Sequence, residues 1–224
     1  MVSICSGWPL RQLLLLLLLI GISTLQSQEL PPKEVEALLA RLAESRGGSG
    51  MQANFREERR LALMEKPVIE TGTVSFLPPD MFRREVNGGS LTACNGDTLW
   101  IFYPQFREVE KYTLSSNRPL RESISAMTSG FGLQDLGRNY RVQAWQTAEG
   151  YRIELHPKTS SLRRAVTAIQ VDISDQLYAR RVEIVGADGD RTTITFSGER
   201  RVKMSPEDFR FQPPTGVRVS EPMK

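Results

Sequence analysis

The feature that most constrains this chain is a change of hydrophobic period near Met51. In residues 32–46, apolar residues recur every three or four residues, and after Met51 they recur every second residue through many short runs. Turn sequences separate these runs, at Asn95-Gly96-Asp97, Glu149-Gly150 and Asp188-Gly189-Asp190. Short strands joined by tight turns predict a mainly β fold, built as a sandwich or a barrel.

The alternating runs predict which residues share one face of the sheet. These sets are Val74 and Phe76; Tyr151, Ile153 and Leu155; Ile169, Val171 and Ile173; Val182 and Ile184; and Thr192, Ile194 and Phe196. One strand differs, because Leu99, Ile101 and Tyr103 alternate with Trp100 and Phe102, so that both of its faces are apolar. Both faces then need cover, from another sheet, from a helix or from a ligand in a cavity.

Two segments have helical spacing. Residues 32–46 begin at a pair of prolines and end at a glycine cluster, with an apolar face formed by Val35, Leu38, Leu39 and Leu42. Residues 119–128 carry Leu120, Ile124 and Met127 on one face. This second helix interrupts the strands, and its sequence fits a fixed cap on an open barrel end or a lid that moves.

The N-terminus has the pattern of a targeting signal. Arg11 precedes an unbroken apolar run from Leu13 to Ile20, and small residues follow up to Ser27. The run is shorter than the roughly 20 apolar residues that span a bilayer. We therefore predict a cleaved signal peptide at residues 1–27 and a single mature domain at 28–224, the alternative being an uncleaved membrane anchor. The mature chain keeps one cysteine, Cys94, which we expect to be a small buried residue on a strand.

Composition and motifs predict neither catalysis nor cofactor binding. The net charge is only +3, and basic residues are interleaved with acidic ones, which argues against a nucleic-acid partner. The one histidine, His156, precedes Pro157 at a strand end, and we expect it to be structural. Paired Cys or His ligands at zinc spacing and a G-x-S-x-G nucleophile motif are both absent from the sequence. We therefore predict a protein that is not an enzyme, with no metal and no cofactor.

The sequence contains more large apolar side chains than we expect to face water. They are Phe55, Phe76, Met81, Phe82, Trp100, Phe102, Phe131 and Trp145. Burying each one stabilises the fold by about 2 kcal/mol. A solid core and an apolar ligand cavity both account for this excess, and the residues alone leave the choice open.

Four segments, taken in order, resemble a known family. They are Gly72-Thr-Val-Ser-Phe76-Leu-Pro-Pro79-Asp-Met-Phe82-Arg83, Asn95-Gly96-Asp97-Thr98-Leu99-Trp100-Ile101-Phe102-Tyr103-Pro104, Leu155-His-Pro157-Lys158 and Phe209-Arg-Phe211-Gln-Pro213-Pro214-Thr-Gly216-Val217. In order and rough spacing this set is similar to the outer-membrane lipoprotein carrier family, the LolA type. The resemblance covers nearly all of the mature chain.

The resemblance implies an incomplete, strongly curved antiparallel β-barrel with helices covering its open side. It also implies a periplasmic carrier that holds the acyl chains of a lipoprotein, or another lipid, and shuttles them from the inner to the outer membrane. Its partners would be that cargo, an inner-membrane donor complex and an outer-membrane acceptor, and the carrier would be a monomer. The alternative is a periplasmic sensor or scaffold of the same fold that binds a lipid or a protein.

The resemblance further implies that the acyl chains lie between the sheet and the helices. The candidate cavity residues are Phe55, Val74, Phe76, Met81, Phe82, Leu99, Trp100, Phe102, Leu120, Ile124, Met127 and Phe131. Which of the strand residues face the cavity depends on the strand register. The segment 119–129 stands where the family has lid helices, and we expect Phe82 to face it at the mouth of the cavity.

One position departs from the family pattern. Carriers of this type often have a basic residue just before the Pro-x-x-Phe segment, and this residue helps to hold the lid closed. Here Pro78 occupies that position, and Arg83 and Arg84 follow a few residues later. The departure is consistent with a divergent branch that carries a different lipid cargo.

Overall fold

The computed structural model describes residues 27–46, 49–78, 80–116, 121 and 136–222. Its strands are β1 (Gln28–Glu29), β2 (Gly50–Arg60), β3 (Val68–Leu77), β4 (Met81–Val86), β5 (Leu91–Asn95), β6 (Thr98–Tyr103), β7 (Glu108–Thr113), β8 (Tyr140–Thr147), β9 (Gly150–Pro157), β10 (Val166–Ser174), β11 (Ala179–Gly186), β12 (Arg191–Val202) and β13 (Arg218–Ser220). The α-helices are α1 (Pro32–Arg46), α3 (Leu136–Asn139) and α4 (Ser160–Arg163), and two 3-10 turns are η1 (Pro104–Phe106) and η2 (Pro206–Phe209).

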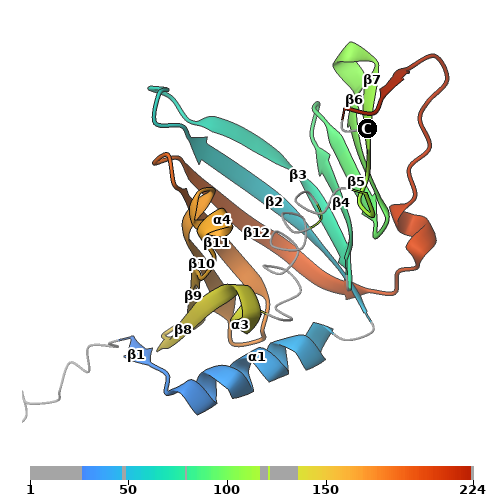
Figure 1. Cartoon of the computed structure of the whole chain (residues 1–224). Helices are drawn as coiled ribbons and strands as arrows, with labels where there is room; N and C mark the ends of the chain where they lie inside the picture. The colour runs from blue at the N-terminus through green and yellow to red at the C-terminus, as the bar shows by residue number, and fades with distance from the viewer. Residues whose placement is uncertain (1–26, 47–48, 79, 117–120, 122–135, 223–224) are drawn as a thin grey trace, which may run out of the picture.

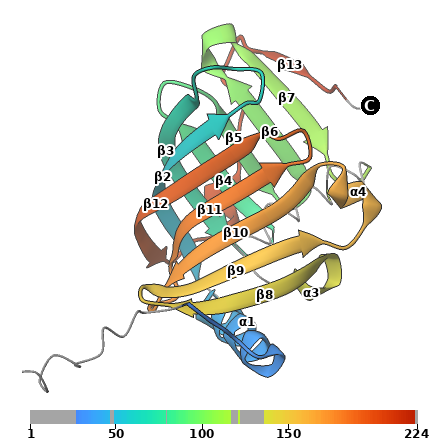
Figure 2. The same ribbon diagram turned by 90° about the vertical axis from the view of Figure 1, so that its left-hand side faces the viewer.

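The described strands form one continuous curved sheet (Figure 1). Its order is β1-β8-β9-β10-β11-β12-β2-β3-β4-β5-β6-β7-β13, and neighbouring strands are antiparallel except β13, which lies parallel to β7. The sheet does not close, because β1 and β13 are its two edges. Figure 2 shows β8 to β12 side by side, with α1 beside the end of the sheet that carries β8. The predicted incomplete, strongly curved antiparallel barrel with helical cover is confirmed.

The predicted Gly turns connect consecutive strands. Gly96, Gly150 and Gly189 have φ angles of +94°, +129° and +91°, in the region that favours glycine. In the first turn, the side-chain oxygen of Asn95 accepts hydrogen bonds from the backbone N–H groups of Asp97, at 3.2 Å, and Thr98, at 2.9 Å. This is the local pairing for which Asn is favoured in turns. The three turns fix the registers of the hairpins β5–β6, β8–β9 and β11–β12.

Strand register places the predicted apolar sets on one face, which we call the inner face. Across β9 to β12, the cross-strand pairs are Leu155 with Ile169, Ile153 with Val171, Val171 with Val182, Val182 with Ile194, and, from β12 to β2, Phe196 with Phe55. Side chains alternate strictly between the faces of a strand, so these pairs form continuous apolar rows. The alternation read from the sequence is therefore confirmed on these strands.

Helix α1 covers part of the inner face. The predicted helix 32–46 is confirmed, and its residues Val35, Leu38 and Leu42 are buried in the same cluster as Ile153 and Phe55. The helix contacts β8 most closely. Each buried leucine stabilises the fold by about 1.5–3 kcal/mol relative to an exposed one. Helix α1 is thus held in place by its apolar face packing on the sheet.

A second cluster continues the inner face along β2 to β6. Its buried members are Met51, Phe76, Phe82, Cys94, Leu99 and Leu114. Cys94 is fully buried on β5, as predicted, and this burial raises the pKa of its thiol. The strand β3 ends at Leu77, directly before Pro78, because proline cannot donate a hydrogen bond to the next strand.

Gly72 lets the ring of Phe55 pack onto the sheet. The two residues are cross-strand partners on β3 and β2. A Cβ at position 72 would clash with the backbone oxygen of Glu85 and lie 2.9 Å from Cε1 of Phe55. The glycine at the start of the Gly-x-Val-x-Phe segment is therefore a packing requirement, since a larger residue there would displace both neighbours.

The C-terminal segment covers the opposite, outer face (Figure 1). Phe209 is 1% exposed, and its turn η2 contacts β4 and β5. The ring of Phe211 lies 5.8 Å from that of Trp100 and 5.7 Å from that of Phe102, measured between centroids. The two-faced strand β6 is thus covered on its outer side by the chain itself.

The predicted signal peptide and the predicted lid helix lie outside the described residues, apart from Ser27 and Arg121. Within the described part of the chain, no helix has the length and apolar character needed to cross a membrane.

We expect Phe209→Ala to lower the free energy of unfolding by about 3–5 kcal/mol, because it leaves a cavity under the C-terminal segment. Phe106→Ala is the matched control, since Phe106 is 71% exposed, and it should change stability by less than about 0.5 kcal/mol. Chemical denaturation followed by circular dichroism measures both. Equal effects of the two substitutions would show that the C-terminal segment adds little to the fold.

Candidate functional site

The inner face of β2 to β6 is the strongest candidate for a functional surface. Phe76 pairs with Phe82 across β3 and β4, Phe82 pairs with Cys94, and Cys94 pairs with Leu99. Phe55 adds a further ring on β2. Val74 is half-buried and lies on the same face of β3 as Phe76, two residues before it. The structure therefore brings together Phe55, Val74, Phe76, Phe82 and Leu99 among the candidate residues.

Other candidate residues lie elsewhere. Trp100 and Phe102 alternate with Leu99 on β6 and so point to the outer face, where Phe211 covers them. Met81 pairs with Leu77 and Asn95, next to Phe82 on β4, and also belongs to the outer face. Leu120, Ile124, Met127 and Phe131 lie outside the described residues. The expected contact between Phe82 and the helix at 120–127 is outside the described part for the same reason.

A narrow crevice opens between the described side chains of the inner face. Met51, Gln52, Ala53, Val74, Phe76, Ala179, Phe196 and Glu199 line it. Its volume is about 10 Å³, which leaves room for about one water molecule. The crevice itself is therefore too narrow for an acyl chain in this conformation.

Four charged residues interrupt the apolar inner face, and we call them the ion-pair group: Glu57, Arg59, Glu70 and Arg84. Glu57 and Glu70 are direct cross-strand partners, so two like charges face each other. One nitrogen of Arg84, Nη2, lies 3.0 Å from Glu57 Oε2 and 2.9 Å from Glu70 Oε2. Arg59 lies 3.3 Å from Glu57 and 3.2 Å from Glu70. Each arginine thus bridges both carboxylates.

The ion-pair group is joined to the apolar cluster. The guanidinium carbon of Arg84 lies 4.5 Å from the centroid of the Phe55 ring, a cation–π contact. The side chain of Glu57 is only 12% exposed, and that of Arg84 is 24% exposed. In the sequence, Glu57-Glu58 looks like two carboxylates on an exposed strand, but the structure places them on opposite faces. The signal that could have revealed this is the alternation that continues from Phe55 to Glu57 to Arg59.

A tyrosine–carboxylate pair lies on the inner face at β7. Tyr112 is the cross-strand partner of Leu99, and its hydroxyl donates a hydrogen bond to Glu110 Oε2 at 2.8 Å. Burial, aided by this hydrogen bond and by the charge of Glu110, raises the pKa of Tyr112 to about 12. Tyr112 therefore remains a neutral donor at any physiological pH.

Among the described residues, no cluster of three or more His, Cys, Asp or Glu side chains could hold a metal ion. His156 lies 3.6 Å from Glu154, on the outer face of β9. On the inner face, both carboxylates of the ion-pair group are occupied by contacts with Arg59 and Arg84.

An open, curved antiparallel sheet with an apolar inner face and an N-terminal helix packed on it defines a class of half-barrel β proteins. Residues 46–212 match the family described as "Outer membrane lipoprotein carrier protein LolA". The chain belongs to this family, and the resemblance seen in its motifs is confirmed.

Individual relatives are more distant. An outer-membrane lipoprotein carrier protein from Serratia proteamaculans (strain 568) is 30% identical over 132 residues, which are 59% of this chain and 61% of that protein. The chain thus matches about three fifths of the relative's length. A crystal structure of an uncharacterized conserved protein from Thermus thermophilus has a TM-score of 0.52 at 13% identity, covering 84% of this chain and 99% of that one. This likeness shows a shared fold.

A LolA superfamily protein from Nitrosomonas europaea has a TM-score of 0.42 at 10% identity, with 79% of this chain and 97% of that chain covered.

We expect Arg84→Met to lower the free energy of unfolding by about 1–3 kcal/mol, because Glu57 and Glu70 would then share only Arg59. Adding Glu70→Gln to this variant should restore part of the loss by removing the like-charge contact. Arg83→Met is the control, since Arg83 makes an exposed pair with Glu85 on the outer face of the same strand. A double-mutant cycle in denaturant measures these terms. No rescue by Glu70→Gln would contradict the bridging role of Arg84.

We also expect stability to fall as the pH rises from about 10 to about 12, the window between the pKa of an unfolded tyrosine and that of Tyr112. In this window the folded protein keeps a proton that the unfolded chain loses, so the free energy of unfolding decreases with pH. Tyr112→Phe should flatten this decrease. Unfolding curves across the window provide the measurement, and an unchanged slope in the variant would refute the assignment to Tyr112.

Proposed function

We propose that this protein binds acyl chains of a lipoprotein, or of another lipid, against the inner face of its curved sheet and carries them across the periplasm. The observation that carries the proposal is the extended apolar inner face, built from two clusters, in a chain of the LolA family. The named relative from Serratia proteamaculans is an outer-membrane lipoprotein carrier protein, which supports the same role here.

The physical logic is transfer without a covalent step. An acyl chain leaves a membrane only if another apolar surface replaces the lipid, at about 0.8 kcal/mol per buried CH₂ group. Release then requires an acceptor that binds more tightly, or a carrier conformation that binds less tightly. The protein would be a monomer exported by its N-terminal signal, with an inner-membrane complex as donor and an outer-membrane protein as acceptor.

Under this proposal the crevice on the inner face would widen if cargo entered it. The crevice between the described side chains, with a volume of about 10 Å³, is too small for an acyl chain. The residues that line the crevice come from four neighbouring strands of the sheet, β11, β12, β2 and β3, and Val74 and Ala179 are among them. Movement of these side chains, with the sheet unchanged, would expose Phe76 and Phe196 to the cargo.

The most direct test is mass spectrometry of lipids and acylated proteins that co-purify with the chain. Recovery of acylated molecules supports the carrier. Recovery of an unacylated protein partner, with no lipid, would favour the alternative role as a periplasmic sensor or scaffold of the same fold.

We expect Val74→Asn to weaken binding of a fluorescent fatty-acyl probe by roughly tenfold or more, because an amide buried against an acyl chain without a partner costs about 1–3 kcal/mol. Val74 is half-buried, so its amide replacement can be hydrated in the empty protein. Ile69→Asn is the matched control on the outer face of the same strand, where Ile69 is 52% exposed. It should bind the probe normally.

Thermal melting by circular dichroism accompanies the binding assay and establishes that both variants fold. Normal probe affinity in a folded Val74→Asn variant would reject this part of the inner face as the acyl site. Equal losses in the two variants would reject a site confined to one face.

A further inference from the structure

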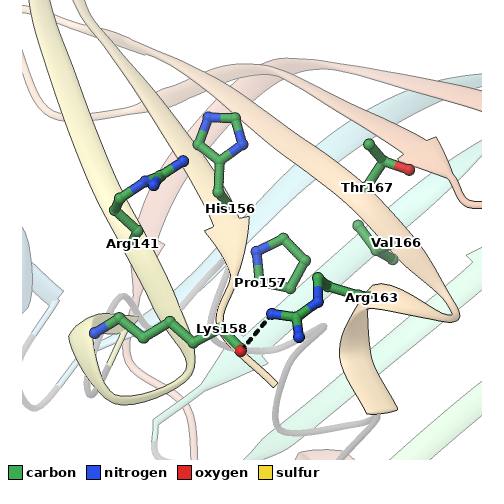
Figure 3. Close-up of a pocket in the computed structure, with 7 residues that line it drawn as sticks. All are labelled: Arg141, His156, Pro157, Lys158, Arg163, Val166 and Thr167. Carbon is green, nitrogen blue, oxygen red and sulfur yellow. Dashed lines mark hydrogen bonds between the residues drawn. The ribbon is translucent and has the colours of Figure 1, made fainter. Parts of the chain in front are cut away.

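A second pocket lies on the outer face, at the ends of β8, β9 and β10 (Figure 3). Arg141 and His156 are cross-strand partners there, and they alternate with the inner-face pair Val142 and Leu155. The pocket is open to solvent and has a volume of about 560 Å³. It is lined by Arg141, His156, Pro157, Lys158, Arg163, Val166 and Thr167. We call it the basic pocket.

The lining of the basic pocket carries positive charge without matching negative charge. Arg141, Lys158 and Arg163 are cationic, and the lining includes no carboxylate. His156 Nε2 lies 3.6 Å from a carboxylate oxygen of Glu154, which is not part of the lining. Since Glu154 is a single negative charge, the positive charge remains in excess even if His156 is neutral.

This imbalance sets the pocket apart from the rest of the sheet. On the outer face, arginines pair with neighbouring carboxylates, as Arg56 does with Glu58, Arg83 with Glu85 and Arg181 with Glu183. Among the described residues, Arg141, Lys158 and Arg163 have no such ion pair. Their charge is therefore available to a ligand.

Backbone contacts hold two of these cations at the pocket. One Arg163 nitrogen, Nη1, donates a hydrogen bond to the backbone oxygen of Lys158 at 2.6 Å, which is the dashed line in Figure 3. Lys158 Nζ donates to the backbone oxygen of Gly137 at 2.5 Å, and its backbone N–H donates to Asn139 at 2.9 Å. Each side chain makes one hydrogen bond to the described part of the fold, which leaves its other N–H groups available to a ligand in the pocket.

We propose that the basic pocket binds the phosphate group of a phosphoester. Arginine and lysine together supply the charged, directional donors that phosphate oxygens accept. The volume of about 560 Å³ is far larger than inorganic phosphate requires, so it can also hold the organic part of the ester beside Pro157 and Val166. The source of the phosphate is either a phospholipid headgroup or a soluble phosphoester.

The key variant is Arg141→Gln, because among the described residues Arg141 makes no side-chain hydrogen bond that the fold depends on. The matched control is Arg41→Gln, which removes the same charge from an exposed position on α1. Two probes distinguish the sources of the phosphate. Glycerol 3-phosphate is titrated by calorimetry, and vesicles of phosphatidylcholine with and without phosphatidylglycerol are tested by co-sedimentation.

We expect Arg141→Gln to weaken binding by roughly tenfold or more, the loss typical of one charge-assisted contact, while Arg41→Gln binds as the unmodified protein does. Binding of glycerol 3-phosphate that depends on Arg141 identifies a soluble phosphoester. Binding only to vesicles that contain phosphatidylglycerol, again dependent on Arg141, identifies a lipid headgroup. Equal weakening by both substitutions would reduce the effect to net charge and overturn the proposal. An absence of binding to either probe would also overturn it.

Discussion

The register between neighbouring strands is the constraint on which the rest of this structure depends. Side chains alternate between faces with a period of two, so a slip of one residue would exchange the inner and outer sets of a whole strand. On most strands such a slip is costly, because it would replace Phe76 with Ser75 on the inner face of β3. On β6 the cost is smaller, since Leu99 and Trp100 are both apolar. The register of β6 is therefore set by its turn at Asn95–Asp97 and by its pairing with β7.

The ion-pair group gives the inner face a polar boundary. Glu57 and Glu70 face each other across β2 and β3, a contact that would be unfavourable without Arg59 and Arg84. Along β2, the boundary begins one inner-face position beyond Phe55, and Arg84 packs on that ring. Paired charges keep part of their hydration, and covering them with an acyl chain would remove it at a cost in free energy. Under the proposed function, cargo would therefore lie on the Phe76 side of Arg84.

Much of the fold could be predicted from the sequence, because local patterns there carry the structure. The helix at 32–46, the Gly turns and the apolar rows on β9 to β12 all follow from spacing alone. The candidate site was harder to predict, because it depends on which face of each strand points inward. Strand β6 is apolar on both faces, so its sequence does not show which face points inward. Trp100 and Phe102 were therefore predicted as cavity residues, but they lie against Phe211 on the outer face. The partner that covers them is more than one hundred residues away in the chain, and no local pattern reveals it.

The position of Trp100 and Phe102 also shows why an excess of large apolar residues does not by itself measure a cavity. Part of the excess stabilises the C-terminal segment, where Phe209 and Phe211 pack on the outer face. The same alternation keeps the two faces chemically independent at the other end of the sheet. On β8, Arg141 faces the basic pocket while Val142, the next residue, packs against the inner core. Substitutions on one face of such a strand leave the other face in contact with the same neighbours. The sheet can therefore hold an apolar inner surface and a charged outer pocket on the same strands, each open to change without disturbing the other.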